Sequence, residues 1–208
     1  MRIQQKVFRG LLISMAALLA AGCVTTEGKL SGGAAFFVSE TDFKDLSVFS
    51  GSQDKSDTGW KVFLGFDPGQ RERIVFEGSY QQMGEATFDG LFQGVTDTGT
   101  IETDVLEVNV GYRYPFTQSF SAGGRVGLAY ADISEEEIFG GTPEARSTDE
   151  TIAYGGLVVR FAPSSNWAIL AYYDYFPDVG KQDVTGEGDI GVLGIGAEFR
   201  FGGRNSDD

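Results

Sequence analysis

Residues 105–131 read VLEVNVGYRYPFTQSFSAGGRVGLAYA, and this stretch decides the fold. Every second residue is apolar or aromatic over 106–114, and the alternation resumes over 120–130 with small residues interspersed. A turn at 115–118 that begins with proline separates the two runs. Because successive side chains point to opposite faces of a strand, period two on both sides of a tight turn predicts an antiparallel β-hairpin.

The same alternation recurs along the chain and predicts about eight strands in all. The other candidate strands lie at 33–43, 59–66, 73–82, 151–161, 167–175 and 190–201. The inward face of 151–161 is ambiguous, with Arg160 opposite Leu157, Val159 and Phe161 as the better assignment. The 30 glycines and 25 Phe and Tyr residues also favour strands over helices, so we expect an all-β chain.

The connections between these strands are alternately short and long. Short turns are expected at 67–72, 115–118 and 162–166, and long, polar, mostly acidic loops at 44–57, 89–100, 132–150 and 177–188. Short turns at one end and long loops at the other are typical of an antiparallel up-and-down β-barrel. An even number of strands places both chain ends on the short-turn side.

Charged residues in the middle of the strands share the face opposite the aromatic side chains. We expect them to line the lumen as a paired network: Lys61, Glu77, Glu107, Arg113, Arg125, Arg160, Asp174, Glu198 and Arg200. A charge that faces lipid near the bilayer centre costs about 2–4 kcal/mol, whereas a lumen charge can pair with another. Eight strands leave an interior that side chains nearly fill, so a stabilising plug is favoured over an ion-conducting lining.

The aromatic residues distinguish a transmembrane barrel from a soluble, lipocalin-like one. Aromatic residues on the apolar face cluster towards strand ends, at Trp60, Tyr80, Tyr112, Tyr114, Phe120, Tyr130, Trp167, Tyr173, Tyr175, Phe199 and Phe201. This is typical of the two interfacial girdles of an outer-membrane barrel. The sequence therefore predicts a transmembrane barrel. The alternative is a lipid-anchored, lipocalin-like periplasmic barrel that binds an apolar ligand.

The strands, the rhythm of the loops and the last segment, GVLGIGAEFRFGG, resemble the eight-stranded outer-membrane β-barrel family that includes the OmpA transmembrane domain and the small OmpX and Ail proteins. The resemblance covers about residues 31–202 and implies the outer membrane of a Gram-negative bacterium. It also implies contact with membrane lipid and lipopolysaccharide, and recognition of the last strand by the barrel-assembly machinery. Phe201 matches the terminal aromatic residue in kind, although GGRNSDD follows it.

Residues 1–22 are typical of a bacterial signal peptide, with a basic start, an apolar run and small residues before Cys23. LLAAGC resembles a lipobox, which implies acylation of Cys23; ordinary cleavage nearby is the alternative. The expected divisions are a signal peptide at 1–22, a periplasmic segment at 23–30, a barrel at 31–202 and a polar tail at 203–208. A disulfide framework is excluded because the chain has one cysteine.

Composition excludes several functions. Loss of residues 1–22 leaves 13 of the 16 basic residues against 30 acidic ones, so nucleic acid is not an expected partner. The chain has no histidine, whereas the enzyme families among membrane barrels, such as lipid A deacylases, phospholipases and omptin proteases, resemble one another in using a catalytic histidine. The carboxylates of 132–150 match no EF-hand spacing, so a solvated loop is favoured over a Ca²⁺ or Mg²⁺ site. We expect a non-enzymatic protein without cofactor or metal, with a role in envelope integrity or in contact with a surface partner.

Overall fold

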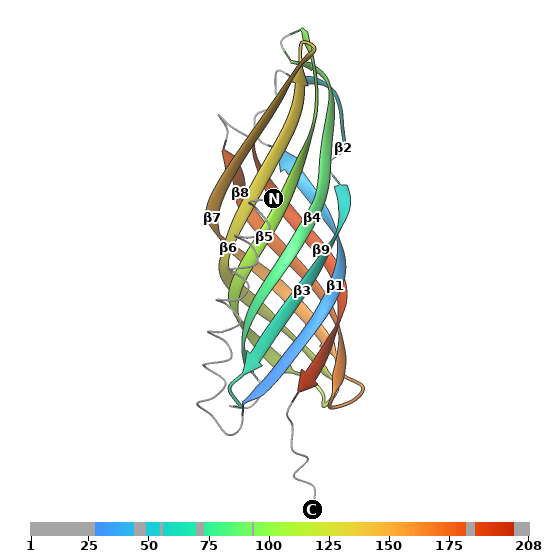
Figure 1. The fold of residues 1–208 in the computed structure, drawn as a ribbon. Coiled ribbons are helices and arrows are strands. Elements are labelled where there is room, and N and C mark those ends of the chain that lie inside the picture. The colour runs from blue at the N-terminus through green and yellow to red at the C-terminus, as the bar shows by residue number, and fades with distance from the viewer. Residues whose placement is uncertain are drawn as a thin grey trace, which may run out of the picture.

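A computed structural model describes residues 28–43, 49–54, 56–69, 73–92, 94–181 and 186–201. The predicted signal peptide, Cys23 and the polar tail at 203–208 lie outside these residues. Within the described ranges, no helix has the length and apolar character needed to cross a membrane. All regular structure there is β-strand (Figure 1).

The strands are long and follow one another along the chain. They are β1 (Lys29–Phe43), β2 (Phe49–Asp54), β3 (Ser56–Asp67), β4 (Ile74–Phe92), β5 (Val95–Pro115), β6 (Phe120–Phe139), β7 (Thr142–Phe161), β8 (Trp167–Lys181) and β9 (Gly186–Phe201). Each of the predicted strands matches one of these elements, and most extend beyond the predicted bounds.

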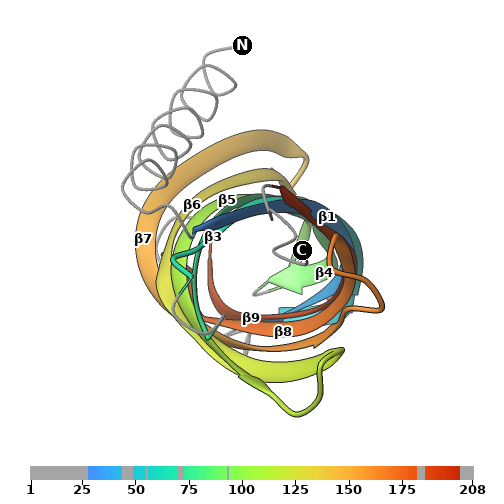
Figure 2. The same cartoon turned by 90° about the horizontal axis from the view of Figure 1, so that it is seen from below.

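The sheet closes on itself. Every pairing is antiparallel, and the first long strand, β1, pairs with the last, β9, from Leu30↔Phe201 to Phe43↔Gly188. β2 and β3 lie end to end along β4, because β2 pairs with 87–92 and β3 with 76–82. They therefore act as one strand of the ring, which confirms the predicted eight-stranded antiparallel up-and-down barrel. Figure 2 shows the ring along its axis.

The short turns at 115–118 and 162–166 are confirmed, and the long loops are largely wrong; the turn at 67–72 lies partly outside the described residues. β4 runs on to Phe92 and β5 starts again at Val95, while β6 runs to Phe139 and β7 starts at Thr142. Segments 89–100 and 132–150 are thus mostly paired strand, and parts of 44–57 and 177–188 are strand as well. Acidic composition indicated loops, but threonines and isolated isoleucines between the carboxylates give these segments a β-forming pattern.

A two-residue turn closes the β6–β7 hairpin. Gly140 and Gly141 both have positive φ, at 56° and 85°. Such turns match the natural twist of the flanking strands and need residues that tolerate positive φ, as glycine does. The pairing therefore continues to the turn, with Phe139 opposite Thr142.

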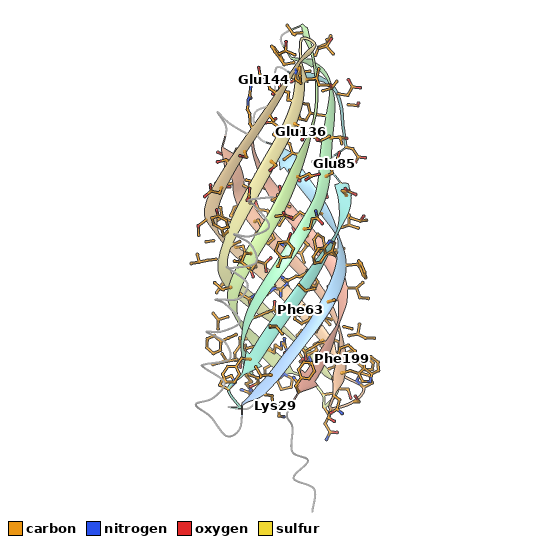
Figure 3. All side chains as sticks on the ribbon, in the orientation of Figure 1. Lys29, Phe63, Glu85, Glu136, Glu144 and Phe199 are labelled. Atoms are coloured by element: carbon orange, nitrogen blue, oxygen red, sulfur yellow. The ribbon has the colours of Figure 1, made fainter. Side chains whose placement is uncertain are left out.

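Strands β4 to β7 rise beyond the rest of the ring (Figure 1). We call residues 84–92, 94–104 and 132–151 the hairpin extension; Glu85, Glu136 and Glu144 lie on it, far from Lys29 and Phe199 at the other end (Figure 3). The β7–β8 pairing ends at Gly155↔Tyr175. Above that point the Glu150 carboxylate accepts a hydrogen bond from the Gly180 N–H and bridges the two strands.

The outer wall of the ring is apolar. Phe36, Leu157 and Leu193 are 74%, 65% and 64% exposed, and the predicted aromatic residues, apart from half-buried Tyr80, are exposed too. The interior holds a smaller apolar core around Phe37, Phe176 and Val192 together with many charged side chains. An apolar exterior contradicts the lipocalin-like alternative, whose apolar face would point inwards.

Candidate functional site

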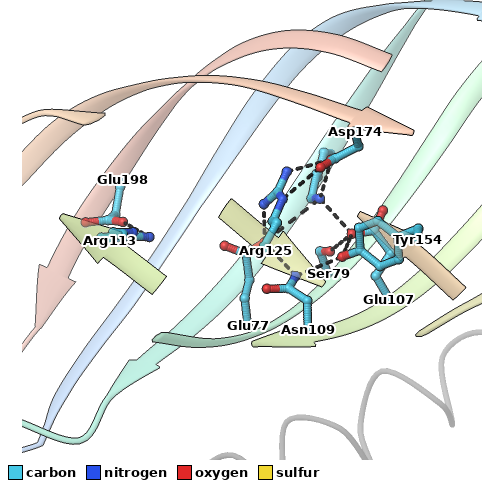
Figure 4. Close-up of polar contacts among 10 residues, drawn as sticks. Glu77, Ser79, Glu107, Asn109, Arg113, Arg125, Tyr154, Asp174 and Glu198 are labelled. Carbon is cyan, nitrogen blue, oxygen red and sulfur yellow. Dashed lines mark hydrogen bonds and ion pairs between the residues drawn. The ribbon is translucent and has the colours of Figure 1, made fainter. Parts of the chain in front are cut away.

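Five buried charged side chains from five strands meet in the middle of the barrel (Figure 4). Arg125 of β6 lies 2.6 Å from Asp174 of β8 and 2.8 Å from Glu77 of β4. Lys61 of β3 lies 2.7 Å from Glu107 of β5, and 3.7 Å and 3.9 Å from Asp174 and Glu77. We call these five residues the central cluster. It holds two cations and three carboxylates.

Three neutral side chains that were not predicted complete the central cluster. The Tyr154 hydroxyl donates to Glu107 at 2.8 Å, and Ser79 donates to the same carboxylate at 2.8 Å. Asn109 donates to the Tyr154 hydroxyl at 2.9 Å and to Glu77 at 3.3 Å. The alternation of β4 and β5 could have identified Ser79 and Asn109, because each shares a face with a predicted charged neighbour.

Two further features shape the same site. The Tyr172 ring lies 5.4 Å from Lys61 Nζ and 5.0 Å from the Arg125 guanidinium, so both cations face its π-system. Gly156 is the register partner of Asp174. A Cβ at this position would collide with the Asp174 carboxylate. The glycine therefore leaves the space that the carboxylate needs to reach Arg125.

A second group lies towards the short-turn end of the barrel. Arg160, Arg200 and Arg113 lie 2.9, 3.2 and 3.3 Å from a single carboxylate, Glu198. We call these four residues the mouth cluster. Figure 4 shows its Arg113–Glu198 pair apart from the central cluster. The nine residues predicted to face the lumen thus form ion pairs in two groups rather than one.

Side chains fill the space between the two clusters. A cavity of about 20 Å³ remains, lined by residues that include Phe63, Val75, Leu170, Arg113 and Arg125. That volume suits about one water molecule. Phe63 and Leu170 are buried there, and the cavity also borders Lys61 and Glu77 of the central cluster.

The inner face of the hairpin extension carries a different kind of acidic group. Asp97 and Glu135 are each 8% exposed, and each has one carboxylate oxygen without a hydrogen-bond partner. Burial and the neighbouring Glu137 raise the pKa of Glu135 to about 7. Burial and the nearby Asp97 also raise the pKa of Glu137. Arg146, 3.5 Å from Glu137, is the basic residue of this face. We call Asp97, Glu135 and Glu137 the tip carboxylates.

The described residues offer no metal centre, since no three acidic, histidine or cysteine side chains among them lie in an arrangement that could hold an ion. In the hairpin extension, the pKa values of Glu135 and Glu137 are raised instead, and Arg146 pairs with Glu137. Buried acids are thus stabilised in two ways, by ion pairing in the ring and by a raised pKa, which favours the neutral acid, in the extension.

The fold and family are shown by comparison with known proteins. In solved structures, the chain is similar to the attachment invasion locus protein Ail of Yersinia pestis, with 19% identity, 85% of this chain and 100% of that chain covered, and a TM-score of 0.56. It is also similar to OprG of Pseudomonas aeruginosa, with 13% identity, coverage of 85% and 96%, and a TM-score of 0.55.

A major outer membrane protein of Thermus thermophilus is similar as well, at 14% identity, coverage of 84% and 99%, and a TM-score of 0.58. At these identities the likeness shows the fold alone. No curated protein matched the sequence. The family model of the outer membrane protein beta-barrel domain matches residues 10–201. The chain therefore belongs to the outer membrane β-barrel domain family and is a protein of the Gram-negative outer membrane.

Proposed function

We propose that this protein is a non-enzymatic surface protein whose ring is the membrane anchor and whose hairpin extension meets a partner outside the cell. The observation that carries this proposal is the continuation of β4 to β7 as paired strands beyond the apolar belt. A paired sheet presents its side chains in fixed positions, as a binding surface requires. The absence of histidine from the sequence fits a role without acid–base chemistry.

The charge of the hairpin extension indicates the chemistry of the partner. Its one basic residue is Arg146, and its acidic residues are Glu85, Asp89, Asp97, Glu102, Asp104, Asp132, Glu135, Glu136, Glu137, Glu144, Asp149 and Glu150. Ail of Yersinia pestis has been solved in complex with a heparin analogue, sucrose octasulfate, which is a polyanion. An acidic surface would repel such a ligand, so the partner proposed here is positively charged.

Removal of exposed carboxylates from the hairpin extension tests this proposal. A variant that changes Glu85, Glu136 and Glu144 to Gln, and Asp89 and Asp149 to Asn, removes five charges from exposed positions. Membrane vesicles that carry the native protein should bind polylysine-coated beads in a salt-sensitive manner and should ignore heparin-coated beads. The variant should lose most of the polylysine binding while it keeps its folded electrophoretic mobility.

The control changes Glu40→Gln and Asp42→Asn, two exposed acidic residues at the upper end of β1, outside the hairpin extension. This control should bind polylysine as the native protein does. Equal losses of polylysine binding in the two variants would show that binding depends on the net charge of the protein and not on the hairpin extension. Binding to heparin by the native protein would contradict the proposal.

We propose further that the central and mouth clusters plug the barrel and hold its strands in register. The five members of the central cluster come from five different strands, and its three shortest ion pairs each join strands that are not neighbours in the sheet. Buried charges are tolerated only when they are paired and hydrogen-bonded, and the cavity between the clusters, at about 20 Å³, leaves no wide path. Planar-bilayer recordings should show no steady conductance above the baseline of protein-free membranes.

The N-terminal attachment is a separate proposal. Cys23 follows LLAAG directly. The first described strand, β1, begins at Lys29, one residue before the Leu30↔Phe201 pair that joins it to the end of β9. A lipid on Cys23 would enter the leaflet next to the short-turn end. Labelled palmitate should be incorporated into the native protein and not into a Cys23→Ser variant. Absence of label from the native protein would contradict the lipid anchor but not the barrel.

A further inference from the structure

A mainly apolar groove lies on the hairpin extension. Its volume is about 540 Å³, within the range of roughly 300–1,000 Å³ that is typical of ligand-binding clefts. Two adjacent rows of residues on β5, β6 and β7 line it, Thr98↔Ile138↔Pro143 and Thr100↔Glu136↔Ala145. These residues alternate with the buried inner face of the extension, so their side chains point outward. We call this site the outer groove.

The outer groove lies beyond the belt that faces lipid. Three polar residues separate Tyr130 of that belt from Ile138 on the outward face of β6: Asp132, Ser134 and Glu136. Ile138 comes eight residues after Tyr130, which at about 3.3 Å per residue is roughly 26 Å along the strand. Figure 3 shows Glu136 high on the extension. Ile138 is nevertheless 50% exposed, and an apolar side chain that is exposed within a groove is typical of a contact site.

The surroundings of the outer groove are acidic. Three carboxylates line it, on Glu136, Glu137 and Glu144. The basic residue of the extension, Arg146, lies 3.5 Å from Glu137 and 2.7 Å from Glu144, so one cation serves two of these acids. Asp89 of β4 is exposed and pairs in register with one wall of the groove. The site thus combines an apolar centre with an excess of negative charge around it.

We propose that the outer groove binds a basic polypeptide segment in which one apolar side chain stands between lysine or arginine residues. This binding mode rests on the proposed function, because it specifies how the positively charged partner is recognised. An apolar anchor in a groove, surrounded by complementary charge, supplies both affinity and specificity. A second copy of this chain would bring a like acidic surface, and lipopolysaccharide would bring phosphates, so charge disfavours both of these occupants.

Two acetylated pentapeptides test the apolar anchor. Lys-Lys-Leu-Lys-Lys and Lys-Lys-Ser-Lys-Lys carry the same charge and differ only in the middle residue. Each is titrated at constant ionic strength against the full chain in phosphatidylcholine nanodiscs, with protein-free nanodiscs as the blank, and the two dissociation constants are compared. The native protein should bind the leucine peptide at least about fivefold more tightly than the serine peptide, because burial of the leucine side chain is favourable.

Two variants of the outer groove locate the site. Ile138→Ser removes the apolar centre, and Ala145→Gln places a polar side chain in the groove. In each variant the preference for the leucine peptide should fall to about twofold or less, while the serine peptide binds as it does to the native protein. Leu91→Ser is the matched control, because Leu91 is 46% exposed on the hairpin extension and does not line the groove. This control should keep the native preference.

The outcomes separate this site from the acidic surface on which it rests. Equal binding of both peptides to the native protein would overturn the apolar anchor and leave the acidic surface standing. Binding of neither peptide would overturn the acidic surface as well. A preference that persists in both Ile138→Ser and Ala145→Gln, or that Leu91→Ser loses as they do, would overturn the assignment to the outer groove.

Discussion

The central cluster and the tip carboxylates are two regions of buried acid that the protein stabilises differently. In the ring, Glu77, Glu107 and Asp174 each contact a cation within 2.8 Å. In the hairpin extension, Arg146 lies 3.5 Å from Glu137 and 2.7 Å from the exposed Glu144, and its own side chain is 44% exposed. The difference indicates where a buried carboxylate requires an ion-pair partner. Lipid surrounds the ring and gives an unpaired charge no alternative partner, whereas groups outside the membrane can exchange protons with water.

Loss of Arg125 from the central cluster should have the largest effect on stability. Arg125→Met leaves Glu77 and Asp174 without their closest cation in the interior. Removal of one partner of a buried ion pair costs about 3–5 kcal/mol, so the free energy of unfolding in urea should fall by that order. Arg146→Met in the extension should cost less than about 1 kcal/mol, because exposed pairs contribute little. Similar losses at both sites would contradict the distinction.

A change of packing at the central cluster should have a smaller effect. Gly156→Ala places a methyl group against the Asp174 carboxylate, which should move the acid away from Arg125 and cost about 1–3 kcal/mol. Urea titration of the refolded barrel measures the loss. Gly155→Ala is the matched control, since its Cβ would meet only the Arg125 carbonyl oxygen at an ordinary 3.7 Å. A neutral Gly156→Ala would show that Asp174 does not depend on this space.

The tip carboxylates should show the smallest effect, visible only as a dependence on pH. Because the pKa of Glu135 is raised from its ordinary 4.5 to about 7, the folded extension binds a proton that the unfolded chain releases. The stability from this group is therefore complete below pH 4.5 and is lost as the pH rises to 7. The protection of the amides over 133–148 against hydrogen exchange, relative to the intrinsic exchange rate at each pH, should fall across that interval, with a loss of at most about 3 kcal/mol in opening free energy.

Glu135→Gln should remove this pH dependence while it keeps the degree of protection found at low pH. Glu136→Gln, at the adjacent exposed position, should leave the dependence unchanged. A pH profile that persists in Glu135→Gln would assign the effect to another acid of the extension, such as Glu137.

The sequence predicts the ring well and the extension poorly, for physical reasons. Residues 105–131 alternate strictly because lipid and lumen impose opposite demands on successive side chains, and their pairing appears as expected. In segment 132–150, carboxylates occupy both buried and exposed positions, as at Glu135 and Glu136, so its apolar alternation is weak and its acidity resembled a loop.

The contacts in the barrel interior could also be predicted only in part from the sequence. The alternation of the strands put Arg113 and Arg125 on one face, but which carboxylate each meets depends on strand tilt and on register between distant strands. Arg125 meets Glu77 and Asp174, while Arg113 meets Glu198. Tyr154 lies in the strand whose face the pattern left ambiguous, and its contact with Glu107 could not be read from the sequence.

The pairing of β1 with β9 has a consequence for how the protein is made. One edge of β1 finds its partners in residues 188–201, so this edge stays open until nearly the whole chain has been synthesised. Joining such distant segments is slow, because chain entropy must be lost before the contacts form. An exposed strand edge meanwhile invites aggregation. The nascent chain must therefore be kept unfolded in transit, and a product truncated before β9 should be removed by proteolysis rather than accumulate in the membrane.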